Sequence, residues 1–148
     1  MSTPDTDGQL AEQLLRLTRR LHRIQKHHLE PLGITPAQSR LLRTLAHYDA
    51  PPRMADLAQR LEVVPRAVTS LVDGLEASGL VRRVPDTTNR RVIRIELTDG
   101  GRTALGRLRG ARRAAAEDIL APLDTAQRAQ LGGLLNALID TPESSRPC

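Results

Sequence analysis

The stretch that decides the fold is residues 65–97, which read PRAVTSLVDGLEASGLVRRVPDTTNRRVIRIEL. Its first half carries apolar side chains at helical spacing: Val68, Leu71, Val72 and Leu75. From Leu80 the period changes to two, which predicts strands over 80–84 and 91–97 around a polar turn at 85–90. A hairpin this small is unstable alone, so we expect it to lean on the preceding helices.

The residues just before this stretch predict further short helices. Residues 54–61 place Leu57, Ala58 and Leu61 on one face, and a three-residue turn leads to Pro65, where the next helix opens. Two short helices around such a turn are typical of a helix-turn-helix. Further upstream, Thr35, Pro36 and Gln38 form a helix start with a capping box.

Long helices are expected at both ends of the chain. Residues 9–30 carry one apolar seam, formed by Leu10, Leu14, Leu17, Leu21 and Ile24, which packs either within the chain or on a partner. A helix over 99–120 follows Thr98-Asp99, and another begins at a second capping box, Asp124 to Gln127. We expect 1–8 to be a disordered leader and 141–148 a frayed tail.

Composition narrows the classes of function. The chain has 148 residues, a net charge of +5 and only 1% aromatic residues, and all but one of its basic residues are Arg. Its pI of about 10.8 fits nucleic-acid binding, or simply a GC-rich genome. The only cysteine is Cys148, so an internal disulfide is excluded. No stretch has the layout of a membrane span or a signal peptide, so we expect a cytoplasmic protein.

The position of the arginines favours DNA. Between Arg82 and Arg94 there are five arginines and one acid, Asp86. This basic segment is either a solvated hairpin face or a DNA-binding wing, and its place directly after a helix-turn-helix favours the wing. The expected DNA-binding residues on the hairpin are Arg82, Arg83, Arg90, Arg91 and Arg94.

The second helix of the motif is expected to enter the major groove with its first residues. These residues are Pro65, Arg66, Thr69 and Ser70, of which Arg66 suits either guanine or a phosphate. On the wing, Arg90 is the expected minor-groove contact. Arg91 and Arg94 are expected to touch phosphate or to pair with Asp86.

These segments resemble the MarR family (multiple antibiotic resistance regulators). The resemblance runs from about Leu10 to Ile139 and is carried by LAQRL (57–61), VTSLVDGLEASGLVRR (68–83), residues 86–91 and LTDGG (97–101), with TPAQ at 35–38. It implies a mainly α fold: a winged helix-turn-helix with a helical dimerisation region. The whole chain, 1–148, would be one domain with dimerisation helices at 9–30 and 120–140, a winged lobe at 35–98 and a connecting helix at 99–120.

The same resemblance implies a function. It predicts a homodimeric transcription regulator, usually a repressor, that leaves a palindromic double-stranded DNA operator when a small molecule binds. The chain departs from the family pattern at Asn89, where an acid often precedes the key arginine. Asn89 and Asp86 are therefore the expected supports of the wing, and Asn89 offers the neighbouring arginine a neutral acceptor in place of a charged one.

Other candidate sites carry weaker signals. By resemblance, an effector pocket between the first, second and fifth helices would use Arg19, His22, Arg23, His47 and Tyr48 and would suit an aromatic or fatty carboxylate; otherwise these are ordinary surface residues. The spacing of the histidines predicts no metal site. Cys148 is read as an inert terminal thiol rather than a redox sensor.

No enzyme motif is present in the sequence. There is no glycine-rich phosphate loop, no paired metal-ligand spacing and no nucleophile elbow, so we expect neither catalysis nor a cofactor. Two alternatives to a ligand-controlled regulator remain open. One is an architectural DNA-binding protein without an effector, and the other is a winged-helix adaptor that binds proteins.

Overall fold

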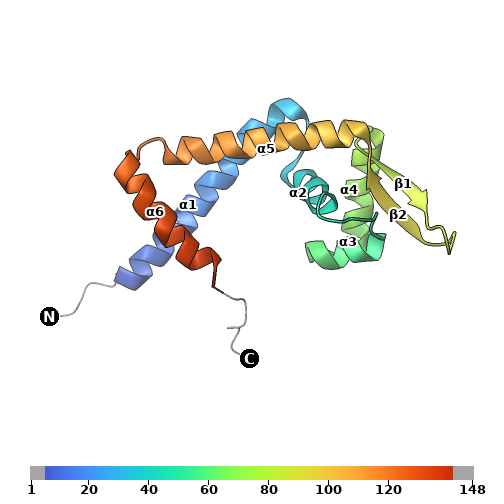
Figure 1. The fold of residues 1–148 in the computed structure, drawn as a ribbon, viewed down its shortest axis with the longest axis horizontal. Helices are drawn as coiled ribbons and strands as arrows, with labels where there is room; N and C mark the ends of the chain where they lie inside the picture. The colour runs from blue at the N-terminus through green and yellow to red at the C-terminus, as the bar shows by residue number, and fades with distance from the viewer. Residues whose placement is uncertain (1–5, 142–148) are drawn as a thin grey trace. The chain divides into compact units, whose positions relative to one another are not determined.

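The computed structural model describes residues 6–141 of the chain (Figure 1). In chain order the elements are α1 (Thr6–Leu29), the short 3-10 helix η1 (Glu30–Leu32), α2 (Pro36–Leu45), α3 (Met54–Leu61), α4 (Pro65–Ala77), β1 (Val81–Pro85), β2 (Ile93–Leu97), α5 (Asp99–Leu120) and α6 (Thr125–Ile139). The predicted mainly helical fold with one hairpin is confirmed. None of the described helices is long and apolar enough to cross a membrane.

The ends of the chain differ in part from the prediction. The first helix begins at Thr6, three residues before the predicted Gln9, so the expected disordered leader is wrong for residues 6–8. The rest of that leader, and the expected tail from 142 onward with Cys148, lie outside the described residues. Contacts divide the chain into two compact units, residues 1–115 and 116–148. The expectation of a single domain stays a prediction.

The core of the first unit is built from aliphatic side chains of seven elements, α1 to α5 and both strands. In Figure 1, α2, α3 and α4 gather beside the hairpin. Ile95 of β2 is fully buried among leucines and valines of these helices, and the first half of α5 joins the same cluster through Ala104, Leu105 and Leu108. Leucine and valine thus fill a core that holds no Phe or Trp. The cluster fixes the position of α4 relative to the hairpin.

Capping boxes at two helix starts are confirmed. At α2 the backbone N–H of Gln38 donates to the Thr35 hydroxyl (3.2 Å), and the Thr35 N–H donates back to the Gln38 side chain (3.0 Å). At α6 the same exchange joins Asp124 and Gln127, at 2.8 and 3.0 Å. These bonds satisfy backbone donors that a helix start leaves free, so the sequence motif sets the helix boundary.

The turn between α3 and α4 has the three residues that the sequence predicts. Its first residue, Glu62, has a φ of 56°, in the left-handed region, and its backbone N–H still bonds to the end of α3. This conformation turns the chain sharply after Leu61, so that α4 begins at Pro65. The helix-turn-helix is therefore present as predicted.

The two strands are antiparallel, with Val81 opposite Leu97 and Pro85 opposite Ile93. They were expected over 80–84 and 91–97, but the first lies one residue later and the second starts two residues later. The loop is therefore longer than predicted, and within it the side chains of Asp86 and Asn89 accept from the backbone N–H groups of Thr88 (2.8 Å) and Arg91 (3.1 Å). The N–H of Ile95 also donates to the Pro52 carbonyl (2.9 Å), so the hairpin leans on the segment before α3.

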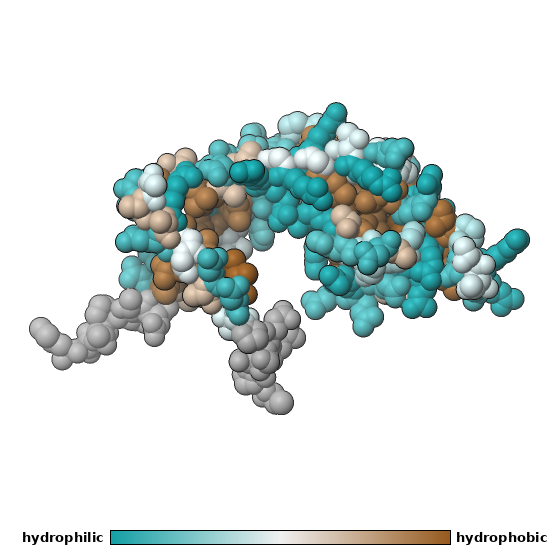
Figure 2. Space-filling model, in the orientation of Figure 1, coloured by the Kyte–Doolittle hydropathy of each residue, from teal (hydrophilic) through white to brown (hydrophobic). Residues whose placement is uncertain are grey.

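The second unit contains the end of α5 and α6. Arg128 of α6 donates to the carbonyls of Leu120 (3.1 Å) and Leu123 (3.3 Å), and its guanidinium pairs with Glu117 (3.1 Å). One arginine thus binds the carbonyl end of α5 to the start of α6. Apolar side chains remain exposed along α6, and Figure 2 shows apolar surface over this helix.

A close approach of α5 to Leu80, the residue before β1, fixes the start of α5. A Cβ on Gly101 would lie 2.0 Å from the Leu80 carbonyl oxygen, which is backbone and cannot move away cheaply. The Thr98 hydroxyl accepts from the Gly101 N–H (3.0 Å) and donates to the Gly79 carbonyl (2.6 Å). Only a glycine at position 101 therefore permits this close packing.

We predict that Gly101→Ala lowers the free energy of unfolding by on the order of 3 kcal/mol, because the added methyl collides with backbone. The matched control is Gly106→Ala on the same helix, where an added Cβ meets nothing within 4 Å. That change should stabilise the chain by about 0.5–1 kcal/mol through helix propensity. Urea unfolding of both variants checks this, and equal effects at the two positions would contradict it.

Candidate nucleic-acid interface

The outer face of α4 carries the residues that the sequence predicts for the major groove. Val68, Val72 and Leu75 are fully buried on the inner face of the helix. The outer face is exposed and presents Pro65, Arg66, Thr69 and Ser70. The structure thus brings these four side chains together at the start of the helix, as a contact with base edges requires.

The Thr69 hydroxyl already makes one hydrogen bond within the helix. Its hydroxyl donates to the Pro65 carbonyl at 3.2 Å. The hydroxyl oxygen keeps lone pairs that can accept a hydrogen bond, so Thr69 suits an amino group on a base edge better than a phosphate. Arg66, in contrast, makes no side-chain hydrogen bond or ion pair within the described residues and can reach outward.

Arg83 binds two acids of α4. Its guanidinium donates to Asp73 (2.6 Å) and Glu76 (2.7 Å), and its backbone N–H donates to Glu76 (3.0 Å). The hydrogen bond that Arg83 donates to Asp73 is the main cause that raises the pKa of Arg83 above its ordinary value. Arg83 joins β1 to α4, and its charge is balanced inside the protein.

Arg82 is also paired within the protein. It lies directly opposite Glu96 across the hairpin, and their side chains form an ion pair. Opposite charges on facing residues of an antiparallel pair stabilise the register. Arg82 and Arg83 were both expected to bind DNA, but the structure places each of them against carboxylates.

Asp86 holds the base of the loop together. Its carboxylate accepts from the Thr88 N–H (2.8 Å), the Thr88 hydroxyl (2.9 Å) and the Arg94 guanidinium (2.7 and 2.8 Å). Arg94 donates further to the Pro51 carbonyl at 2.8 Å. These bonds, with those from Thr88 as the largest cause, hold the pKa of Asp86 well below its ordinary value of 3.8. We call Asp86, Thr88, Arg94 and the Pro51 carbonyl the wing clamp.

Asn89 supports the loop through the backbone. Its side-chain oxygen accepts from the Arg91 N–H (3.1 Å), and its carbonyl accepts from the Val92 N–H (3.0 Å). Both bonds need only a neutral acceptor, so an acid is not required at this position to shape the turn. The ionic contact of this region joins Arg94 to Asp86, which is one of the two roles that the sequence offers for Arg94.

The tip of the hairpin keeps two free cations. Arg90 and Arg91 are exposed and have no hydrogen-bonded or ionic side-chain partner among residues 6–141. Figure 2 shows mostly hydrophilic surface at this end of the hairpin. Of the five hairpin arginines, Arg82, Arg83 and Arg94 are neutralised by carboxylates, and the remaining two are available to an outside anion.

The five residues predicted for an effector site do not line one cavity. On α1, Arg19 pairs with Glu12 (3.2 Å), and both His22 and Arg23 are exposed. After α2, His47 is exposed, and the ring of Tyr48 lies 6.0 Å from the Arg60 guanidinium carbon. Their role as an effector site stays a prediction.

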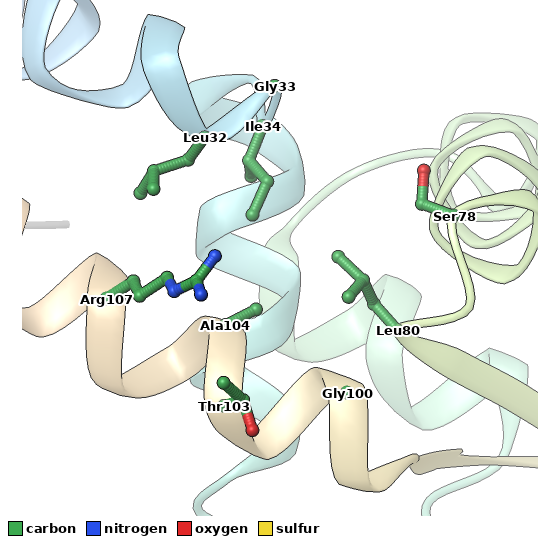
Figure 3. A pocket seen from close by; sticks show the side chains of 9 residues that line it. All are labelled: Leu32, Gly33, Ile34, Ser78, Leu80, Gly100, Thr103, Ala104 and Arg107. Atoms are coloured by element: carbon green, nitrogen blue, oxygen red, sulfur yellow. The ribbon is translucent and has the colours of Figure 1, made fainter.

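A different cavity lies in the first unit, between the end of η1, the end of α4 and the start of α5 (Figure 3). Its volume is about 330 Å³, and its lining is Leu32, Gly33, Ile34, Ser78, Leu80, Gly100, Thr103, Ala104 and Arg107. Figure 3 shows the Arg107 side chain and Ala104 facing Leu32 and Ile34 across the opening. No sequence pattern predicts this cavity, because its lining comes from the ends of elements far apart in the chain.

Among residues 6–141, no three His, Cys, Asp or Glu side chains gather closely enough to hold a metal ion.

Comparison with known proteins agrees with this geometry. The family model described as the MarR family matches residues 34–93. The HTH-type transcriptional repressor MdtR of Bacillus subtilis is 37% identical over 98 residues, which cover 64% of this chain and 63% of MdtR. The HTH-type transcriptional repressor Rv2887 of Mycobacterium tuberculosis is 31% identical over 110 residues, which cover 74% of this chain and 78% of that protein.

Solved structures are similar over nearly the whole chain. The YusO protein of Bacillus subtilis has a TM-score of 0.80 and 27% identity, covering 96% of this chain and 100% of YusO. Rv2887, solved in complex with DNA, has a TM-score of 0.73 and 29% identity, covering 87% of this chain and 96% of that structure. The chain belongs to the MarR family. Its matches span 63%, 56% and 60% of the lengths of MdtR and two further Bacillus relatives.

We predict that Asp86→Asn lowers the free energy of unfolding at pH 7, because Arg94 loses its ionic partner. The folded-state pKa of Asp86 is depressed, so its carboxylate stabilises the chain fully above the ordinary value of 3.8 and less as pH falls below it. The difference between wild type and variant should therefore narrow below about pH 4. Urea unfolding from pH 7 to pH 3 measures this. Asp49→Asn, at an exposed position, is the matched control, and a gap that does not change with pH would contradict the clamp.

Proposed function

We propose that the chain is a sequence-specific double-stranded DNA-binding transcription regulator. It acts as a homodimer in the cytoplasm. The observation that carries the proposal is the distribution of charge. Three hairpin arginines are neutralised within the protein, while Arg90 and Arg91 at the tip and Arg66 on α4 have no carboxylate partner among residues 6–141. If the hairpin arginines served only to stabilise the fold, Arg90 and Arg91 would be expected to have carboxylate partners as well.

In the proposed complex, α4 lies in the major groove and the hairpin follows the adjacent minor groove. Arg66 then reaches a guanine edge or a phosphate, and Thr69 accepts from a base amino group. Arg90 enters the minor groove, where a narrow A·T-rich segment has the most negative potential. The wing clamp supports this placement because it holds the loop against the segment before α3.

The dimer is proposed from exposed leucines on the two terminal helices. On α1, Leu10, Leu14 and Leu17 are 63%, 57% and 44% exposed at the predicted seam positions. On α6, Leu134, Leu138 and Ile139 are exposed to a similar or greater degree. Exposed apolar stripes of this length usually mark an interface. A second copy of the chain would cover them and would place two α4 helices on a palindromic operator.

Repression is proposed because relatives are named as repressors. MdtR and Rv2887 both carry that description, and Rv2887 has been solved with DNA. A repressor needs only to occupy its operator, which the proposed interface can do without a further partner.

We predict that Arg90→Ala and Arg91→Ala each weaken operator binding about 5- to 100-fold, the loss of one good charged contact. The probe is a duplex selected from a random pool by the wild-type chain, and fluorescence anisotropy gives the affinity. Arg109→Ala, an exposed arginine on α5, is the matched control and should bind normally. Sedimentation should find two chains per duplex.

Other outcomes would contradict the proposal. A selected duplex that binds no better than random DNA would contradict a sequence-specific regulator and would favour an architectural protein. Unchanged operator binding by both tip variants would contradict a contact between the wing and the DNA. One chain per duplex would contradict the dimer.

We further propose that a small apolar carboxylate binds in the cavity of Figure 3 and releases the DNA. Its walls include Leu32, Ile34 and Leu80, and Arg107 supplies a cation that has no ionic partner among residues 6–141. The cavity touches Ser78 just after α4 and Gly100 at the start of α5. A ligand there would therefore act on the elements that fix α4 and the hairpin.

We predict that benzoate or octanoate raises the Tm of the wild-type chain and lowers its affinity for the selected duplex. Arg107→Gln should lose most of both effects, because the carboxylate loses its charged partner. Arg109→Gln is the control and should respond like wild type. Equal responses of wild type and Arg107→Gln would show that any binding occurs elsewhere, and no response to either acid would contradict the proposed ligand class.

A further inference from the structure

Two adjacent valines precede α4, and the structure separates them. Val63 is partly buried and packs on the core cluster, whereas Val64 is 66% exposed. Among the large apolar side chains of residues 6–141, the others exposed to this degree lie on α1 or α6. Val64 is therefore an isolated apolar group, and it lies beside Pro65 and Arg66 at the start of the proposed recognition helix.

Val64 also occupies a position where a polar residue would stabilise the fold. It is the N-cap of α4, with φ −67° and ψ 149°, and its side chain makes no capping hydrogen bond. Thr35 and Asp124 cap α2 and α6 from the same position. Serine, threonine, aspartate or asparagine is strongly preferred at such sites. Local stability therefore does not explain a valine here.

The surroundings of Val64 argue against a protein partner. The exposed residues that follow it at the start of α4 are Arg66, Thr69 and Ser70. A protein-docking patch normally spans several hundred Å² of apolar surface, far more than one valine provides. A single apolar side chain within a basic and hydroxyl-bearing surface fits the major groove of DNA better.

We propose that Val64 reads thymine in each half of the operator through the C5 methyl group. That methyl is the apolar group that a base pair presents in the major groove, and it distinguishes thymine from every other natural base there. The backbone of Val64 is held on both sides, by the partly buried Val63 and by the ring of Pro65, so its side chain projects from a fixed place. This inference rests on the proposed function and adds a specificity-determining residue to it.

The test removes one methyl at a time. The duplex is first selected from a random pool by the wild-type chain, and it is then resynthesised with deoxyuridine in place of thymidine at each position of both half-sites. Deoxyuridine lacks only the C5 methyl and keeps all base pairing. With the wild-type chain, one symmetric position should lose about fourfold in affinity per half-site, the effect of exposing one buried methyl group.

The decisive variant is Val64→Ser. Serine can cap α4, so the variant should fold and should have a raised Tm. It lacks both methyl groups, so it should bind the thymidine and deoxyuridine duplexes with equal affinity. Val64→Ile is the matched control and should keep the preference for thymidine.

The possible failures are distinguishable. If no duplex is selected over random DNA, the proposed function fails and this inference fails with it. If a duplex is selected but no thymine position responds to deoxyuridine, or if Val64→Ser keeps the wild-type preference, the inference alone is overturned. A raised Tm combined with a lost preference is the result that a purely structural role for Val64 would not give.

Discussion

Arg94 connects parts of the chain that lie far apart in sequence. It binds Asp86 in the wing through two nitrogens and donates to the Pro51 carbonyl before α3, a residue 43 positions away. The Asp86 side chain is only 10% exposed, so water competes little for the ion pair. A two-stranded hairpin has little stability of its own. These contacts and the bond from Ile95 to Pro52 hold it as a wing of fixed direction beside α4.

Helix faces and helix starts could be predicted because they depend on the sequence of neighbouring residues. The spacing of Val68, Val72 and Leu75 gives the buried face of α4 directly, and the pairs Thr35–Gln38 and Asp124–Gln127 mark helix starts within four residues. The same local rules set the three-residue turn before Pro65. For these features the tertiary structure adds little to what neighbouring residues already determine.

Charge pairing could not be predicted in the same way. The carboxylates that bind Arg83 come from Asp73 and Glu76, seven to ten residues earlier on a different element. Whether an arginine of the hairpin is free depends on which acids the fold brings beside it, and composition cannot show this. The surroundings of the residues predicted for the effector site, and of Val63 and Val64, depend on tertiary packing in the same way. Val63 and Val64 are neighbouring valines, so residue type cannot tell them apart. The direction that the chain takes at Glu62 decides which of them packs on the core.

The internal neutralisation of Arg82, Arg83 and Arg94 has a consequence for how binding depends on ionic strength. A cation already paired with a carboxylate displaces few counterions when it approaches a phosphate. If each free cation contributes a slope of about 0.9 in the dependence of log affinity on log salt, each wing contributes about two units rather than about five. The proposed complex would therefore keep more of its affinity as salt rises than its arginine content suggests. Discrimination between sequences would then rest more on contacts that salt does not screen.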